Sequence, residues 1–229
     1  IHDRRQRQMC IRDRAKEQWR HTLNQVAVAD RERLGDLAIE QNWFDLAIDA
    51  ANSGAIWDRL DLRFPAVHWD EFQRIAALQQ LDAYELIAVA RRESGLYPFA
   101  RSKVGARGLM QLMPSTARSM AAKQSTGYRG DASLYQPNIN ILLGATYYRE
   151  LMQRYERNRV KSLAAYNAGP SRVSRWSSGA LPLDQWVDSL PFGETREYVQ
   201  AVLAYTVIYR TRSGVTASLL TESERTARY

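Results

Sequence analysis

Apolar residues recur every third or fourth position along most of the chain, and no segment of useful length alternates apolar and polar residues as a strand does. This periodicity predicts an all-α fold. Two or three helices are expected within residues 15–52, and further helices at 69–76, 81–93, from 114, 137–151, 163–167 and 194–212. Residues 97–112 lack helical periodicity and contain two glycines, which predicts an irregular loop. The aromatic residues of the early helices, such as Trp43 and Phe72, are expected to pack in the core.

Composition excludes several protein classes. A chain of 229 residues is long enough for one large domain with a smaller attachment, and 45% apolar with 25% charged residues is typical of a globular protein. No apolar run approaches the roughly 18 residues of a membrane-spanning helix. A single cysteine, Cys10, and three scattered histidines predict neither a disulfide framework nor a metal site.

The net charge of +7 is concentrated near the start of the chain. Residues 1–20 hold seven basic and three acidic residues, so the remaining 209 residues carry only +3. Such a mild balance does not by itself distinguish a nucleic acid from another polyanion. Because the body of the chain is nearly neutral and lacks a basic recognition helix, we expect no nucleic-acid partner.

Residues 1–14 are expected to be non-native or disordered. Residues 9–13 (MCIRD) read like the translation of a transposon-end adapter used in sequencing libraries, and a natural basic arm is the alternative. We therefore expect the native N-terminus to lie outside this sequence, and the absence of a signal peptide says nothing about location.

Glu93 is the first candidate for catalysis. It ends a helix whose preceding turns are apolar, so its carboxylate is expected near the edge of the core. Burial raises the pKa of a carboxyl group, and a glutamic acid with a pKa near neutrality can act as a general acid. The alternative is an exposed glutamate paired with Arg91 or Arg92.

Further motifs change the balance between these two interpretations. Residues 105–111 (GARGLMQ) combine two glycines with an amide side chain, and residues 165–169 (AYNAG) place a tyrosine and an asparagine on a short helix that ends at a glycine. These motifs belong to a series of stretches that, in this order, resemble the soluble lytic transglycosylases. Those proteins are peptidoglycan-cleaving enzymes with a goose-lysozyme-like catalytic domain. The matching stretches are residues 90–94, 102–114, 138–145, 164–170 and 191–199.

The resemblance implies a domain organisation. Residues 15–78 resemble the helical linker and last superhelical turns of those enzymes, 79–214 the lysozyme-like catalytic domain, and 215–229 form a C-terminal tail. It implies a periplasmic location in a Gram-negative bacterium, glycan strands of peptidoglycan as the partner, cell-wall synthesis proteins as possible further partners, a monomer, no integral membrane segment and no cofactor or metal.

The resemblance also implies residue roles. Glu93 is the catalytic residue. The sugar subsites are lined by Ser102, Gln111, Met113 and Tyr166, with Glu194 across the cleft. The residues expected to shape the site are Ser94, Gly108, Asn167 and Gly169. Glu194 has an alternative explanation, because a carboxylate at a helix N-terminus is favourable with the helix dipole regardless of function.

A lytic transglycosylase needs only one carboxylate, because a hydroxyl of the substrate replaces the second nucleophile; most glycosidases need two. The implied reaction leaves 1,6-anhydroMurNAc ends, with Glu93 acting as acid and then as base. The rivals are a hydrolytic muramidase, in which Glu194 or Asp131 would place a water, and a catalytically silent peptidoglycan-binding scaffold. Glu85 lies on the same helix as Glu93 but belongs to none of the motifs, so replacing it is expected to leave activity within a few-fold.

Overall fold

The computed structural model describes the backbone of residues 2–177 and 181–229, with side chains from residue 14 onward. The chain divides into two compact units, a small unit of Ile1–Val67 with Gly95–Tyr97 and a large unit of His68–Ser94 with Pro98–Tyr229. Every regular element of the described residues is a helix, and the only pairings of strand type are isolated bridges in the loop after α6. The all-α prediction is confirmed.

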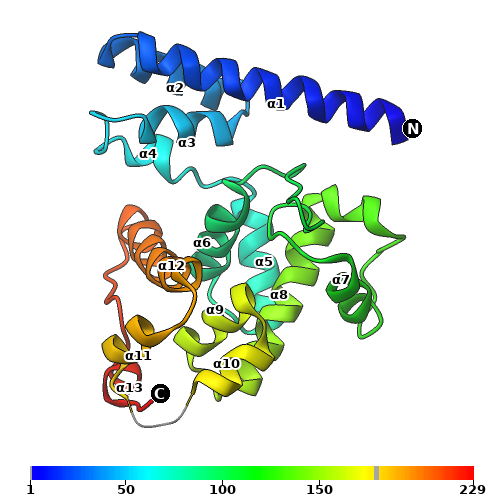
Figure 1. Cartoon of the computed structure of the whole chain (residues 1–229), viewed down its shortest axis with the longest axis vertical. Coiled ribbons are helices and arrows are strands. Elements are labelled where there is room, and N and C mark those ends of the chain that lie inside the picture. The colour runs from blue at the N-terminus through cyan, green and yellow to red at the C-terminus, as the bar shows by residue number, and fades with distance from the viewer. Residues whose placement is uncertain (1, 178–180) are drawn as a thin grey trace. The chain divides into compact units, whose positions relative to one another are not determined.

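The small unit consists of helices α1–α4, which are His2–Gln25, Val28–Glu40, Phe44–Asn52 and Leu60–Arg63 (Figure 1). Its core is a cluster of small and branched side chains made by Ala38, Ala47, Ala51, Ile56 and Leu62. Trp19 packs against this cluster, and its indole nitrogen donates a hydrogen bond of 3.1 Å to the Leu46 carbonyl oxygen.

Two expectations for the first part of the chain need comment. The prediction that Trp43 packs in the core is wrong: this residue is 40% exposed because it precedes α3 as its N-cap, off the face that buries Ala47 and Ile48. Phe72, in contrast, is fully buried. The side chains of residues 1–13 lie outside the described part of the chain, so the expectation for residues 1–14 stays a prediction.

The large unit contains the remaining elements. They are α5 Trp69–Gln79, α6 Ala83–Ser94, α7 Pro114–Ala121, the 3-10 turn η1 Asp131–Tyr135, α8 Pro137–Arg154, α9 Arg159–Ala168, α10 Pro170–Trp176, α11 Leu183–Ser189, α12 Gly193–Arg212 and α13 Glu222–Thr226.

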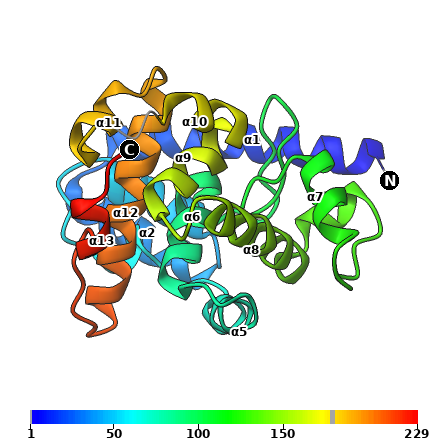
Figure 2. The ribbon, with the colours of Figure 1, turned by 90° about the horizontal axis from the view of Figure 1, so that it is seen from below.

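Helix α6 occupies the centre of the large unit. It packs against α12 on one side and α5 on another, while α9 packs against both α8 and α12 (Figures 1 and 2). The side chains from Leu86 to Ala90 are all fully buried, which explains the unbroken apolar run in this helix. The fold thereby brings the C-terminal ends of α6 and α9 and the N-terminal end of α12 into one region.

Candidate active site

Glu93 lies in the last turn of α6 and is half-buried. Burial raises the pKa of its carboxyl group from an ordinary value of 4.5 to about 7, and the negative charge of Glu194 acts in the same direction. The Tyr198 hydroxyl and the positive charge of Arg92 oppose the shift without cancelling it. Glu93 therefore has the proton affinity expected of a group that donates and accepts a proton near neutral pH.

Two predicted site residues brace the loop that follows α6. The Gln111 amide nitrogen donates to the Ala100 carbonyl at 3.1 Å and to the Gly108 carbonyl at 2.9 Å. The Ser102 hydroxyl accepts a hydrogen bond of 3.0 Å from the Ala106 amide. The Gln111 amide nitrogen and the Ser102 hydroxyl oxygen are thus engaged within the loop and help to shape its backbone, while the expected contacts of both residues with sugar stay a prediction.

The same loop is fastened to the end of α6 and to the start of α7. Ser94 donates from its hydroxyl to the Leu109 carbonyl at 2.8 Å, directly beside Glu93 in the sequence. Met113 is the N-cap of α7 and is 39% exposed, so its side chain is accessible to a ligand. Met110, three residues earlier, is fully buried.

Gly108 and Asn140 form the tightest contact under the loop. Gly108 has a φ of +79°, and a Cβ atom there would lie 2.1 Å from the Leu134 carbonyl oxygen. The buried Asn140 amide donates to the Arg107 and Leu134 carbonyls at 3.0 and 2.9 Å and accepts from the Met110 amide at 2.7 Å. Sequence reasoning assigned no role to Asn140, although an amide on the apolar face of the 137–151 helix is a usable signal.

Tyr166 lies in the last turn of α9. Its hydroxyl donates to the Met110 carbonyl at 2.8 Å, and its ring centroid lies 5.4 Å from that of Tyr147. Burial, and after it the negative charge of Glu93, raise the pKa of Tyr166 well above its ordinary value. Tyr166 and Glu93 thus share one electrostatic environment.

Asn167 and Gly169 shape the turn after α9. The Thr195 hydroxyl donates a hydrogen bond of 2.7 Å to the Asn167 side-chain oxygen, which ties the end of α9 to the start of α12. Gly169, with a φ of +91°, ends α9 and caps the start of α10. Asn167 thus joins two helix ends, and its expected role in shaping the site stays a prediction.

The first turns of α12 contain two residues that influence Glu93, the exposed Glu194 and the buried Tyr198. Glu194 is exposed in the first turn, where the helix dipole also favours a carboxylate. Tyr198, one turn later, is buried, and within the described structure its hydroxyl has no hydrogen-bond partner at standard distance. It is nevertheless close enough to lower the pKa of Glu93. Sequence reasoning included Tyr198 in the motif at 191–199 but assigned it no role.

Two further carboxylates are engaged elsewhere. Asp131 is paired with Arg107 at 3.1 Å and Arg118 at 3.3 Å. Replacement of Glu85 was expected to leave activity within a few-fold, which stays a prediction, but Glu85 is 2% exposed and accepts hydrogen bonds from Tyr148 and Arg159. A substitution of Glu85 is therefore no neutral control.

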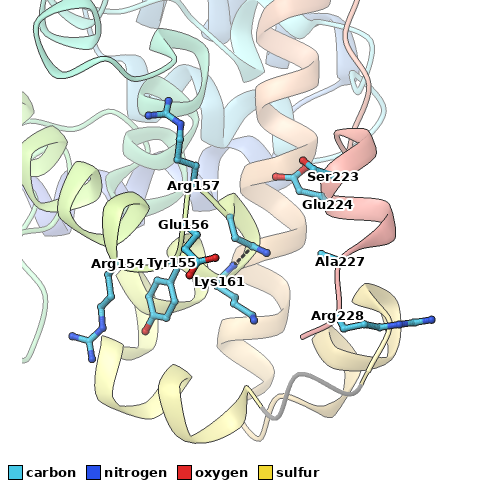
Figure 3. Close-up of a pocket in the computed structure, with 10 residues that line it drawn as sticks. Arg154, Tyr155, Glu156, Arg157, Lys161, Ser223, Glu224, Ala227 and Arg228 are labelled. Carbon is cyan, nitrogen blue, oxygen red and sulfur yellow. Dashed lines mark hydrogen bonds between the residues drawn. The ribbon is translucent and has the colours of Figure 1, made fainter.

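One well-defined cavity of the described residues lies away from Glu93. Figure 3 shows this cavity of about 410 Å³ between the turn that joins α8 to α9 and helix α13, lined in part by Glu156, Lys161 and Arg228. None of the predicted site residues lines it. Across the described residues there is also no cluster of three or more histidine, cysteine or acidic side chains that could hold a metal, and no helix long and apolar enough to cross a membrane.

Comparison with known families identifies the kind of protein that carries this site. Residues 70–188 match the transglycosylase SLT domain, residues 189–217 the soluble lytic transglycosylase helical domain, and residues 8–60 the soluble lytic murein transglycosylase L domain. The chain belongs to the soluble lytic transglycosylase family. The family predicted from the motifs is thereby confirmed.

Individual members of the family are similar over nearly the whole chain. The soluble lytic murein transglycosylases of Salmonella typhimurium and Escherichia coli K12 are 38% and 37% identical over 219 residues, which is 94% of this chain and 34% of each relative. The crystal structure of the E. coli 70 kDa soluble lytic transglycosylase superposes with a TM-score of 0.89 at 36% identity, over 96% of this chain and 36% of that one.

A second solved structure, of the lytic transglycosylase Slt from Pseudomonas aeruginosa, gives a TM-score of 0.85 at 37% identity, over 90% of this chain and 34% of that one. That structure is of an inactive mutant in which a glutamate is replaced by glutamine. The chain thus spans about a third of the length of the relatives that it matches.

Proposed function

We propose that the large unit is a peptidoglycan lytic transglycosylase that cleaves the MurNAc-β-1,4-GlcNAc bond without water and leaves 1,6-anhydroMurNAc ends. The observation that carries this proposal is Glu93, a half-buried carboxyl group with a pKa raised to about 7 at the end of a central helix. The inactive glutamate-to-glutamine mutant of the Pseudomonas relative agrees with a single essential glutamate.

One carboxyl group is sufficient for the proposed reaction. Protonated Glu93 donates its proton to the bridging oxygen as the bond from that oxygen to muramyl C1 breaks. The N-acetyl carbonyl of the same sugar stabilises the positive centre at C1. The Glu93 carboxylate then removes the proton of the C6 hydroxyl as O6 bonds to C1. Glu93 is protonated again at the end, and the balanced reaction consumes neither water nor a cofactor.

The neighbouring residues suit the binding of a glycan. Met113 presents an exposed apolar side chain, and Tyr166 presents an aromatic ring held by its hydroxyl contact to Met110. Glu194 offers an exposed carboxylate to sugar hydroxyls. We assign Ser102 and Gln111 a shared role, which is to hold the loop backbone in the shape that the subsites need.

The substrate class also implies a location and partners. We infer that the protein acts as a monomer on glycan strands in the periplasm of a Gram-negative bacterium, because peptidoglycan lies there. Proteins of cell-wall synthesis are the further partners that such an activity implies. Cell fractionation with antibody detection tests the location, and a protein found wholly in the cytoplasm would contradict it.

The decisive experiment is mass spectrometry of the fragments released from purified peptidoglycan by the full chain. We expect non-reducing 1,6-anhydro muramyl ends, each lighter by one water than a hydrolysed end. Glu93→Gln should abolish their release, whereas Glu222→Gln, which neutralises an exposed carboxylate on α13, should not. Predominantly reducing muramyl ends would refute the proposal in favour of the muramidase, and binding without cleavage would favour the silent scaffold.

A further inference from the structure

The last twelve residues lie outside all three matched family ranges, the last of which ends at residue 217. Most of these residues are exposed, but Glu224 and Tyr229 are buried and anchor the segment to the large unit. Tyr229 is fully buried, its ring centroid lies 5.2 Å from that of Trp186, and its backbone exchanges two hydrogen bonds with Leu181, of 2.9 and 3.2 Å. The Lys161 ammonium group lies 5.0 Å from the centre of the Tyr229 ring. These contacts hold the C-terminal segment in a defined position, so we ask what that position contributes to the large unit.

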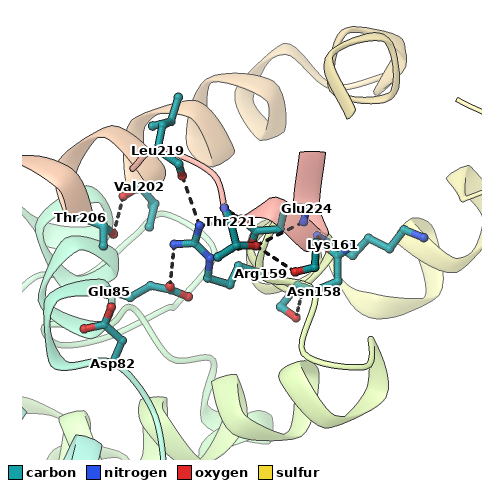
Figure 4. A network of polar contacts seen from close by, with 12 residues as sticks. Asp82, Glu85, Asn158, Arg159, Lys161, Val202, Thr206, Leu219, Thr221 and Glu224 are labelled. Carbon is teal, nitrogen blue, oxygen red and sulfur yellow. Dashed lines mark hydrogen bonds and ion pairs between the residues drawn. The ribbon is translucent and has the colours of Figure 1, made fainter. Parts of the chain in front are cut away.

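The segment is fastened to the rest of the unit by one arginine. Arg159 donates from Nε and Nη2 to the two oxygens of Glu224 at 2.6 and 2.7 Å, and from Nη2 to the Leu219 carbonyl at 3.2 Å (Figure 4). Thr221 holds Glu224 in place, since its amide donates to the Glu224 carboxylate at 2.8 Å in a capping box. The paired geometry of Arg159 and Glu224 is therefore fixed from both sides.

The third partner of Arg159 is a residue of the central helix. Arg159 Nη1 lies 3.4 Å from one carboxylate oxygen of Glu85, and the other oxygen of Glu85 accepts a hydrogen bond from the Tyr148 hydroxyl of α8. Glu85 and Glu224 are both nearly inaccessible to solvent. Burial raises the pKa of Glu85, against the attraction of Arg159. In Figure 4 the Arg159 guanidinium group lies between these two carboxylates.

The position of this network along the helices connects it with the active site. Glu85 is in the first turn of α6, and Arg159 is the first residue of α9. The opposite ends of these two helices carry Glu93 and Tyr166. Eight residues of helix separate Glu85 from Glu93, a rise of about 12 Å. In addition, the Tyr148 ring lies edge-on to Tyr166, with centroids 6.1 Å apart.

We propose that Arg159 is a positioning residue for the reaction: held by Glu224 of the C-terminal segment, it fixes the start of α9 against the start of α6 and so sets the placement of Tyr166 relative to Glu93. The inference rests on the proposed function and adds a role for the C-terminal residues. Neither Arg159 nor Glu224 touches the substrate. Misplacement of reacting groups by about 1 Å from a distant change can reduce the rate of an enzyme by a factor of about 100.

The test compares Glu224→Gln with Glu222→Gln in the full chain. Both substitutions remove one negative charge from α13, but Glu222 is exposed and lies outside the network. The readouts are kcat and KM on soluble, uncrosslinked glycan chains, measured well below the melting temperature of each variant, so that loss of stability alone does not change them. We expect kcat to fall at least threefold for Glu224→Gln with KM unchanged, and no change in either constant for Glu222→Gln.

Arg159→Lys is the second variant, should Glu224→Gln fail to fold. It keeps the positive charge and loses the two-pronged contact, so kcat should again fall at least threefold at constant KM. A folded variant of either kind with kcat closer than threefold to wild type overturns the inference, whatever its melting temperature. Failure of the wild-type chain itself to release anhydro ends refutes the proposed function instead, which distinguishes the two.

Discussion

Replacing Glu93 with glutamine should stabilise the protein at high pH and leave its stability nearly unchanged at low pH. The glutamine side chain has the same shape and no titratable proton. The folded state raises the pKa of Glu93 to about 7, whereas the unfolded chain has the ordinary value of 4.5. Folded molecules therefore hold the proton of Glu93 more strongly than unfolded molecules do.

The sign and size of the effect follow from this difference. Between about pH 4.5 and pH 7 the folded state binds more protons, so the free energy of unfolding falls as the pH rises, and the loss is complete above pH 7. A difference of about 2.5 pKa units corresponds to about 3 kcal/mol at 1.36 kcal/mol per unit, as an upper limit for this half-buried group. Glu93→Gln removes that loss and should add up to about 3 kcal/mol at pH 8.

Thermal unfolding followed by circular dichroism at pH 4 and pH 8 provides the measurement. For a chain of this size the expected gain corresponds to a rise of roughly 6–12 °C in Tm at pH 8, beyond any difference at pH 4. Other titrating groups affect wild type and variant alike and cancel. The exposed Glu197→Gln control should change stability by less than about 0.5 kcal/mol at both pH values. Equal shifts of Glu93→Gln at pH 4 and pH 8 would refute the reasoning.

Three further predictions concern the groups around Glu93. Tyr198→Phe removes a hydroxyl that favours the ionised form of Glu93, so the alkaline limb of the pH profile of kcat/KM should move to higher pH. Glu194→Gln removes a negative charge that favours the protonated form, so the same limb should move to lower pH; movement in the opposite direction in either variant would contradict the site geometry. Gly108→Ala places a Cβ atom 2.1 Å from the Leu134 carbonyl at a φ of +79°, so denaturant titration should show a loss of more than about 1 kcal/mol.

Much of the fold was predictable from the sequence, because helix periodicity and helix breakers act locally. Pro114 and Pro137 stand in the first turns of α7 and α8, as expected for a residue that lacks an amide hydrogen. The beginning of α9 was not predicted. That helix starts at Arg159, four residues before the predicted start, because the Asn158 side chain accepts the Lys161 amide at 3.0 Å.

The candidate site was predictable in its residue types and less so in the contacts of each residue. A motif indicates that Gln111 matters, but only the folded loop shows that its amide donates to backbone carbonyls. The buried network of Glu85 could not be predicted either, because it joins Glu85 to Arg159, which lies 74 positions later in the chain. Long-range polar contacts depend on how the helices pack, which local patterns do not specify.

The value of burying Glu93 can be expressed as a population of protonated molecules. At pH 7 a carboxyl group with a pKa of 4.5 is protonated in about one molecule in 300, whereas one with a pKa of about 7 is protonated in about half. The gain of roughly 150-fold in available acid is comparable with the 10²–10⁴-fold that general acid–base catalysis contributes. In the proposed reaction the carboxylate left by the first step is also a stronger base than an ordinary glutamate, because its conjugate acid has the same raised pKa. A pKa near 7 therefore suits both steps that we propose for Glu93, and in this chain burial at the end of α6, with the charge of Glu194, raises the pKa to this value.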